Sequence, residues 1–336
     1  MLTELEISKL WFEGQKLAKR NINKCYHPNC EKPSINSHIL QKSGILNQIS
    51  KEGHVWEKKI NLFSAETFFF EKSGLNTVFS FNCFCQSHDT ELFQKIENEK
   101  INFDDYNSCL LFTIRTIYNE IYRKEVIVEQ LKFLMKSERS AELSLELMIG
   151  FMEQQLLGIS DLQNNVQDIW EDYYTGTQNF IFQYRKITKI DICLSGFYNY
   201  ETTLEMMNYS VENGKDMNRI SEVFINFFPY NNQSILLMGY NRKDAVKLKP
   251  YVNTFFKESE AKVQTKLTNL LMFACETWVV SENLYNSKIR KVEDVFISAV
   301  KYAIQNNNER EFFKVNIFKD TYCLDMQKLK LRLNKY

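Results

Sequence analysis

The chain has 336 residues, of which 44% are hydrophobic and 25% are charged, and its 42 basic residues balance its 42 acidic ones. This composition is typical of a globular protein and excludes a disordered or fibrous chain. A net charge of zero also excludes bulk electrostatic attraction as the force that would bring the protein to nucleic acid.

The first hundred residues are predicted to form one helix and several short elements. Apolar residues at helical spacing indicate an amphipathic helix over residues 3–20. A strand is expected at residues 78–81, after a stretch of loops and short elements. Asp89 and Thr90 are favourable N-cap residues, so the next helix is expected to begin there.

The rest of the chain is predicted to mix helices and strands. Three- and four-residue periodicity indicates helices over residues 105–175, with Asp104 and Asp105 in the capping turn. The period then changes, and residues 178–240 contain four expected strands, at 179–185, 190–196, 222–228 and 233–240. Two more helices are expected within residues 260–305, one of them from Val263 to Trp278.

Histidine is confined to the start of the chain. All four histidines and four of the eight cysteines lie before residue 90, so metal or imidazole chemistry is expected only there. The cysteine spacing does not suit a disulfide framework, which favours a reducing, cytoplasmic environment. No secretory signal and no run of eighteen apolar residues is present, so no membrane partner is expected.

Two pairs of residues have the spacing of zinc ligands. Cys25 and Cys30 are separated by four residues, and Cys85 and His88 are separated by two. Zinc favours sulfur and nitrogen ligands at the corners of a tetrahedron, and each pair can supply two of them from one turn of chain. The spacing therefore predicts a structural zinc ion bound by these four residues.

Two other residues are alternative ligands. His27 lies inside the first loop and could replace a cysteine. Cys83 is two residues before Cys85, so the two side chains would share a face if the preceding strand continued that far. The alternative to zinc is a set of buried free cysteines beside a surface histidine.

With these ligands identified, the N-terminal part resembles the HNH endonuclease group of treble-clef zinc proteins. The resemblance covers about residues 20–98 and rests on the first cysteine pair and two segments, Ser37-His38-Ile39-Leu40 and Cys85-Gln86-Ser87-His88-Asp89. The expected fold is α+β, with an HNH-like zinc module at residues 1–104 and a mixed region at residues 105–336. The two segments are also similar to bacterial proteins without an established activity, some of them linked to phage defence.

The resemblance implies a metal-dependent nuclease. His38 matches the general base, and Asp89 falls where the family places a histidine that binds a catalytic Mg or Mn ion. Ser37 departs from the family pattern because this position often supplies another metal ligand, and Leu40 stands near an expected proline. The central asparagine of the family matches one of three candidates, Asn47, Asn61 and Asn76.

Two functions are compatible with these features. The first is an HNH-like nuclease that acts on phosphodiester bonds. The ten basic and four acidic residues between Lys9 and Ile60, a surplus of six positive charges, favour this function. The alternative is a non-catalytic protein with a structural zinc site that binds a protein or nucleic acid, in which His38 is structural or replaces a zinc ligand. Phosphate-binding glycine loops and Gly-x-Ser-x-Gly motifs are lacking, so other enzyme classes find little support.

Overall fold

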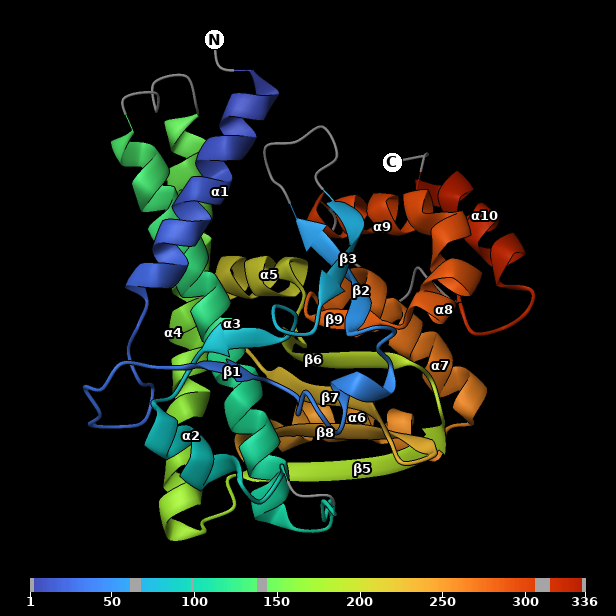
Figure 1. Ribbon diagram of the computed structural model, residues 1–336, viewed down its shortest axis with the longest axis horizontal. Helices are drawn as coiled ribbons and strands as arrows, with labels where there is room; N and C mark the ends of the chain where they lie inside the picture. Colours follow the sequence, from blue (N-terminus) through green and yellow to red (C-terminus); the bar gives the residue numbers. More distant parts are fainter. Residues whose placement is uncertain (1–2, 61–67, 98–99, 138–143, 306–314, 334–336) are drawn as a thin grey trace. The chain divides into compact units, whose positions relative to one another are not determined.

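The computed structural model describes residues 3–60, 68–97, 100–137, 144–305 and 315–333. These residues form a mixed helix-and-strand protein, as the α+β prediction requires (Figure 1). The α-helices are α1 (Glu4–Asn21), α2 (Gln86–Phe93), α3 (Tyr106–Lys136), α4 (Leu145–Thr175), α5 (Thr203–Asn213), α6 (Ala245–Lys257), α7 (Glu260–Asn269), α8 (Glu282–Leu284), α9 (Glu293–Gln305) and α10 (Tyr322–Leu333). In the described part of the chain, no helix combines the length and apolar character needed to cross a membrane.

The strands are β1 (Asn36–His38), β2 (His54–Ile60), β3 (Phe68–Gly74), β4 (Ser80–Asn82), β5 (Phe180–Thr188), β6 (Ile192–Asn199), β7 (Glu222–Tyr230), β8 (Gln233–Asn241) and β9 (Trp278–Val280). Short 3-10 segments lie at Leu46–Gln48, Arg242–Asp244 and Arg290–Val292, and π-helical segments at Leu270–Ala274 and Tyr285–Ile289.

Two compact units interleave along the sequence. The first comprises residues 1–39, 59–69 and 79–177, and the second comprises residues 40–58, 70–78 and 178–336. Helices α3 and α4 therefore belong to the same unit as the predicted zinc ligands, and the expected boundary at residue 104 falls inside that unit.

The first unit packs three helices beside a small sheet. Strands β1 and β4 pair antiparallel, with His38 opposite Ser80. Helices α1, α3 and α4 share a buried apolar cluster of Trp11, Leu131, Leu134 and Met148. The predicted capping turn is present, because the Asp105 carboxylate accepts a hydrogen bond of 2.6 Å from the backbone N–H of Ser108 at the start of α3.

The structure corrects two predicted boundaries beside the zinc ligands. The strand expected at residues 78–81 is β4, which begins only at Ser80 because Phe79 has a left-handed φ of 54°. Helix α2 begins at Gln86 rather than at Asp89 or Thr90, with Cys85 as its N-cap residue. The Asp89 N–H already donates to the Cys85 carbonyl at 2.9 Å, so the first turn is complete there.

The second unit is built around a seven-stranded sheet of order β3-β2-β9-β6-β7-β8-β5. Strands β7 and β8 form a hairpin whose turn is the pair Asn231-Asn232, with Asn231 at a φ of 55° and Tyr230 paired with Gln233. One buried core joins apolar side chains of the sheet to helices α6, α7, α9 and α10, and its members include Ile225, Met238, Leu248, Val263, Phe296 and Met326.

The helix predicted from Val263 to Trp278 is wrong at its end. Helix α7 stops at Asn269, the chain passes through a π-helical segment, and Trp278 begins β9. Trp278 pairs with Leu194 of β6, more than eighty residues earlier in the chain. A pairing between such distant residues outweighs the local helical spacing of the apolar residues.

Candidate metal centre

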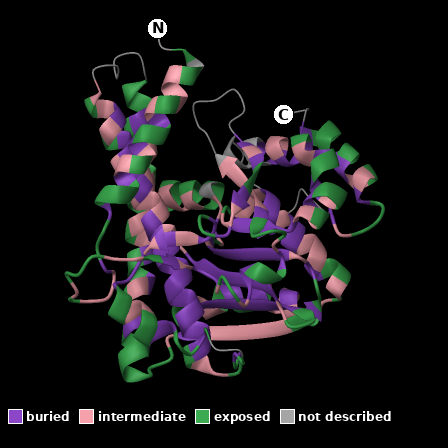
Figure 2. Ribbon diagram, in the orientation of Figure 1, coloured by how far each residue is buried: buried purple, intermediate pink, exposed green. Residues whose placement is uncertain are grey.

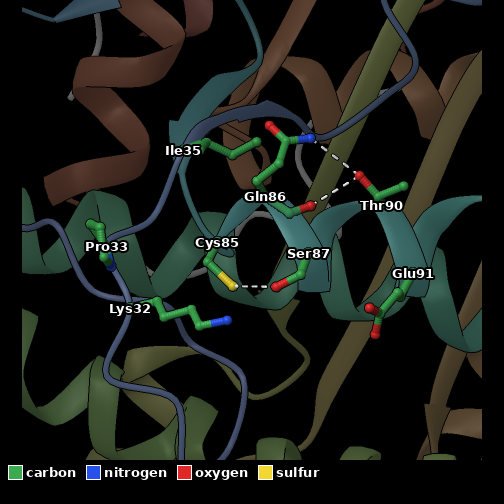
Figure 3. Close-up of a pocket in the computed structure, with 8 residues that line it drawn as sticks. All are labelled: Lys32, Pro33, Ile35, Cys85, Gln86, Ser87, Thr90 and Glu91. Carbon is green, nitrogen blue, oxygen red and sulfur yellow. Dashed lines mark hydrogen bonds between the residues drawn. The ribbon is translucent and has the colours of Figure 1, made fainter.

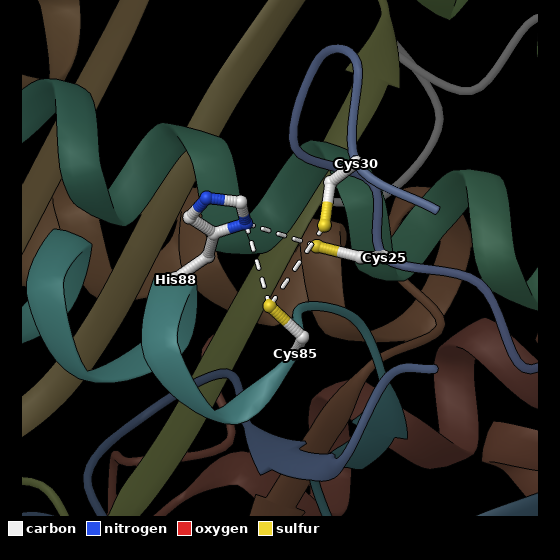
Figure 4. Close-up of side chains that lie close together, drawn as sticks. All are labelled: Cys25, Cys30, Cys85 and His88. Carbon is white, nitrogen blue, oxygen red and sulfur yellow. Dashed lines mark hydrogen bonds between the residues drawn. The ribbon is translucent and has the colours of Figure 1, made fainter. Parts of the chain in front are cut away.

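The four predicted zinc ligands lie together in the first unit. The ligand atoms of Cys25, Cys30, Cys85 and His88 are all within 4.8 Å of one another. His88 Nδ1 is 3.4 Å from the sulfurs of both Cys25 and Cys85, and the sulfurs of Cys30 and Cys85 are 3.9 Å apart. Figure 4 shows the three sulfur atoms and this nitrogen pointing toward one another.

Backbone hydrogen bonds align the two turns that carry these ligands. Cys30 N–H donates to His27 O at 3.2 Å and so closes the first turn, in which Asn29 has a φ of 61° that asparagine tolerates well. Tyr26 N–H donates to Cys83 O at 2.9 Å, which ties the first turn to the chain that leads into α2. The backbone therefore places the two ligand pairs beside each other.

The donor set fits a zinc ion. Zinc–sulfur bonds of about 2.3 Å in a tetrahedron place ligand atoms roughly 3.8 Å apart, close to the distances in this cluster. Cys25 and Cys85 are 5% and 3% exposed, whereas Cys30 and His88 are partly exposed, so half of the ligands are screened from water. A zinc ion there would cross-link two turns that are separated by 54 residues of chain, and its four protein ligands would leave no open coordination position.

The ligands differ in how readily they lose a proton. Burial raises the pKa of Cys25 to about 11. Burial also raises the pKa of Cys85, but hydrogen bonds from Ser87 and the His88 backbone and from the neighbouring thiols bring it down to about 7. Burial and then the nearby His27 lower the pKa of His88, which favours the neutral imidazole that binds metals. Cys85 therefore loses its proton more readily than Cys25 does, and the lowered pKa of His88 favours metal binding by this imidazole.

His27 covers the cluster and is not one of its members. Its ring is stacked on His88, with centroids 3.7 Å apart and an interplanar angle of 16°. His27 Nδ1 lies 3.0 Å from Pro28 O, and a carbonyl can only accept, so this nitrogen carries the proton. The other nitrogen, Nε2, then accepts from the Tyr174 hydroxyl at 3.2 Å. Both ring nitrogens are occupied, so His27 does not need to replace a ligand.

Cys83, the other alternative, is also outside the cluster. Its side chain is 1% exposed. Burial, and then the nearby Asp89 carboxylate, hold the pKa of this thiol well above its usual value, so it stays protonated. The choice of Cys85 from its spacing to His88 therefore agrees with the geometry.

Helices α3 and α4 supply contacts to the metal centre that sequence reasoning missed. Tyr26, next to Cys25, is stacked on Tyr118 of α3 with ring centroids 4.9 Å apart and donates a hydrogen bond to Glu125. Trp170 of α4 donates to the Tyr118 hydroxyl at 2.7 Å. These residues lie about 90 to 145 positions after Tyr26, and no local spacing signals their contact.

The residue predicted to bind a catalytic metal has other partners. Asp89 Oδ1 accepts a hydrogen bond of 2.7 Å from Ser37 Oγ and lies 3.8 Å from Arg115 Nη2. His38 follows Ser37 in β1, and successive side chains of a strand point to opposite faces. The structure thus brings Ser37 to Asp89 and directs His38 to the other face of the strand.

Arg115 explains why Asp89 is held there. This arginine is 2% exposed, and its guanidinium lies 3.9 Å from the centre of the Phe93 ring. A buried cation requires carboxylate partners, and Arg115 has two, Asp89 and Glu97, with Nη2 2.5 Å from Glu97 Oε1. Asp89 therefore has a structural contact within the first unit.

The three candidates for the central asparagine have different outcomes. Asn61 lies outside the described residues. Asn47 accepts a hydrogen bond of 3.1 Å from Ser50, and Asn76 accepts one from Lys42. Neither contact identifies the family's asparagine, so this match stays a prediction.

An open pocket adjoins the metal centre (Figure 3). It is lined by Lys32, Pro33, Ile35, Cys85, Gln86, Ser87, Thr90 and Glu91. The Gln86 and Thr90 side chains are joined by a hydrogen bond of 3.2 Å across the first turn of α2. Lys32 and Glu91 have opposite charges, so the pocket lining does not favour a ligand of one sign.

No protein-family model, curated protein or solved structure matches the chain. The HNH resemblance stays a prediction that rests on the ligand spacing and the surrounding residues.

Proposed function

We propose that Cys25, Cys30, Cys85 and His88 bind one structural zinc ion, and that the protein is a non-catalytic binding protein for a macromolecular partner. The observation that carries the proposal is the convergence of four protein ligands within 4.8 Å. Sites of this kind are closed and stabilise a fold, whereas catalytic zinc sites keep one position for water or substrate.

The contacts of Asp89 support a structural role for the module. A nuclease of the HNH type would need this position to bind its catalytic ion, but the Asp89 carboxylate neutralises the buried Arg115 and accepts from Ser37. Withdrawing it toward a metal would leave Arg115 with one carboxylate partner, Glu97, whose side chain is 40% exposed. This arrangement favours a stabilising module over a catalytic one.

The metal content of the purified protein tests the structural site. We expect one zinc per chain by mass spectrometry, and loss of both zinc and thermal stability in Cys30→Ser and Cys85→Ser. Cys193→Ser is the matched control, because Cys193 is a buried cysteine of β6 outside the cluster. Zinc-free wild-type protein that unfolds at the same temperature as the loaded protein would refute the structural site.

A nuclease that cleaves phosphodiester bonds is a second candidate, favoured by the order of elements around His38. His38 ends β1, β1 pairs with β4, and the chain passes from β4 to Cys85 and α2. This is the order of strand, ligand turn and helix that the resemblance implies for a treble clef.

A cleavage assay distinguishes the two functions. Plasmid DNA and RNA are incubated with the zinc-loaded protein and Mg or Mn, beside His38→Ala with the same zinc content. We expect no cleavage above background from either protein. Cleavage by wild type that His38→Ala abolishes would overturn the non-catalytic proposal and establish the nuclease.

A further inference from the structure

The first half of α4 exposes an apolar stripe with acidic residues along one edge. Leu145, Ile149 and Leu156 are 51%, 38% and 47% exposed, and their spacing of four and seven residues places them on one side of the helix. Glu146 and Glu153 are also exposed and are also seven residues apart. The whole of α4 contains six acidic residues and no lysine or arginine.

Helix α1 exposes a similar stripe that has lysines along one edge. Leu5 and Phe12 are 65% and 49% exposed and are seven residues apart. Lys9 and Lys16 are exposed, have the same interval, and lie along one edge of this stripe, with the exposed Glu13 beside them. Two apolar stripes of the same chain therefore repeat with the heptad interval of coiled coils, one flanked by lysines and the other by glutamates.

Packing inside the first unit leaves the α1 stripe outward. The opposite side of α1 is committed to α3, where Trp11 is 4% exposed and its carbonyl accepts 2.7 Å from Gln130. A Cβ on Gly14 would lie 2.9 Å from the Phe133 ring, so the two helices are in close contact there. Figure 2 shows the outer side of α1 largely in the exposed and intermediate colours.

The charged edges of both stripes are open to a partner. Lys9, Lys16, Glu146 and Glu153 form no ion pair with another residue of the described ranges. Exposed apolar side chains that repeat at heptad intervals along two helices favour an interaction surface over ordinary solvated helix faces.

We propose that a second copy of the chain docks on this surface, with α1 of one protomer antiparallel to α4 of its partner. Equal seven-residue intervals then place Lys9 opposite the partner's Glu153 and Lys16 opposite the partner's Glu146 in one register. Phe12 packs on the apolar stripe between these pairs. A two-fold axis repeats the contact, so each dimer contains it twice.

The charges of Lys9, Lys16, Glu146 and Glu153 favour this orientation. In an antiparallel pair the lysine edge of α1 faces the glutamate edge of α4. In a parallel pair the lysines would face the other side of the α4 stripe, where Met148 is 3% exposed and packed with Trp11 of α1, and which offers no charge. Pairing α4 with a second α4 would instead oppose glutamate to glutamate, which is unfavourable.

Charge reversal of the full chain tests the proposal by sedimentation analysis at several micromolar concentrations. The wild type is expected to be a dimer. Lys9→Glu/Lys16→Glu and Glu146→Lys/Glu153→Lys, each alone, should raise the dimer dissociation constant by about tenfold or more, because four pairs per dimer become repulsive. An equimolar mixture of the two variants should recover dimerisation, because both contacts of the mixed dimer again join opposite charges.

Two controls separate this contact from general effects. Lys328→Glu reverses an exposed charge on α10 and should leave the dimer unchanged. Leu156→Ala should weaken it without any change of charge, while the zinc content and circular dichroism of every variant stay those of the wild type. A wild-type monomer at all these concentrations, or variants that do not recover on mixing, would overturn the proposal.

Discussion

The imidazole of His27 is stacked on that of His88, with ring centroids 3.7 Å apart, and the Tyr174 hydroxyl is hydrogen-bonded to Nε2 of His27. A cysteine or histidine beside a metal cluster is easily taken for a ligand. Here the extra histidine instead fixes the orientation of the ligand, as the outer contacts of metal-binding histidines commonly do.

We expect His27→Ala to weaken zinc binding by roughly ten- to a hundredfold without abolishing it, because the ligand set stays complete while His88 loses its support. Competition with a chromophoric chelator measures this affinity. His27→Phe keeps a flat ring but loses both hydrogen bonds of His27. Its zinc affinity should therefore lie between those of the wild type and His27→Ala. Complete loss of zinc from His27→Ala would show that His27 is itself a ligand.

The contact of Asp89 with Arg115 can be tested by unfolding. Asp89→Ala should lower the free energy of unfolding by about 2–4 kcal/mol, since it removes one of two carboxylates from a buried cation. Ser37→Ala should cost about 1 kcal/mol, the contribution of one hydrogen bond. Combining the two should cost less than their sum, because the hydrogen bond can be lost only once. Strict additivity would argue that the two side chains act separately.

Glu201 should make the second unit sensitive to acid. Burial opposes its ionisation, but hydrogen bonds from Lys247 and Ser221 dominate and lower the pKa of this carboxyl below its usual value. A carboxyl with a lowered pKa in the folded state adds stability above its pKa in the unfolded chain and loses that contribution as the pH falls through the folded pKa.

The free energy of unfolding should therefore decline below about pH 4.5 in the wild type, in part because of Glu201. Glu201→Gln should be about 1–3 kcal/mol less stable at pH 7, and the difference from wild type should shrink on acidification. Denaturant unfolding at a series of pH values measures both. A difference that stays constant from pH 7 to pH 3 would contradict the role assigned to the Glu201 charge.

Gly239 of β8 is predicted to tolerate no side chain. A Cβ there would lie 2.4 Å from the Phe182 ring of the neighbouring strand β5, and 3.2 Å from the Ile181 carbonyl. Gly239→Ala should lower the free energy of unfolding by about 1–3 kcal/mol. Combining it with Phe182→Leu should recover part of the loss if the ring is the obstacle, and no recovery would point to the backbone instead.

The residues whose chemistry is local could be identified from the sequence. The two ligand pairs are each contained in one turn of chain, so their spacing alone singled out Cys25, Cys30, Cys85 and His88, which the fold then brings within 4.8 Å. The helical period over residues 105–175 and the strands between 178 and 240 were likewise readable, because period and turn residues are properties of short segments.

Only the tertiary structure decided which distant segments contact one another around the metal centre and in the large sheet. Spacing could not show that Trp170 and Tyr118 support the first cysteine turn. It could not show either that Asp89 accepts a hydrogen bond from Ser37 and pairs with Arg115. It also could not show that Trp278 begins a strand and does not end a helix. These outcomes depend on contacts between residues that are tens of positions apart, and such contacts leave no periodic signal in the chain. The sequence by itself determined which side chains could bind a metal, while the packing of distant helices and strands decided what surrounds them.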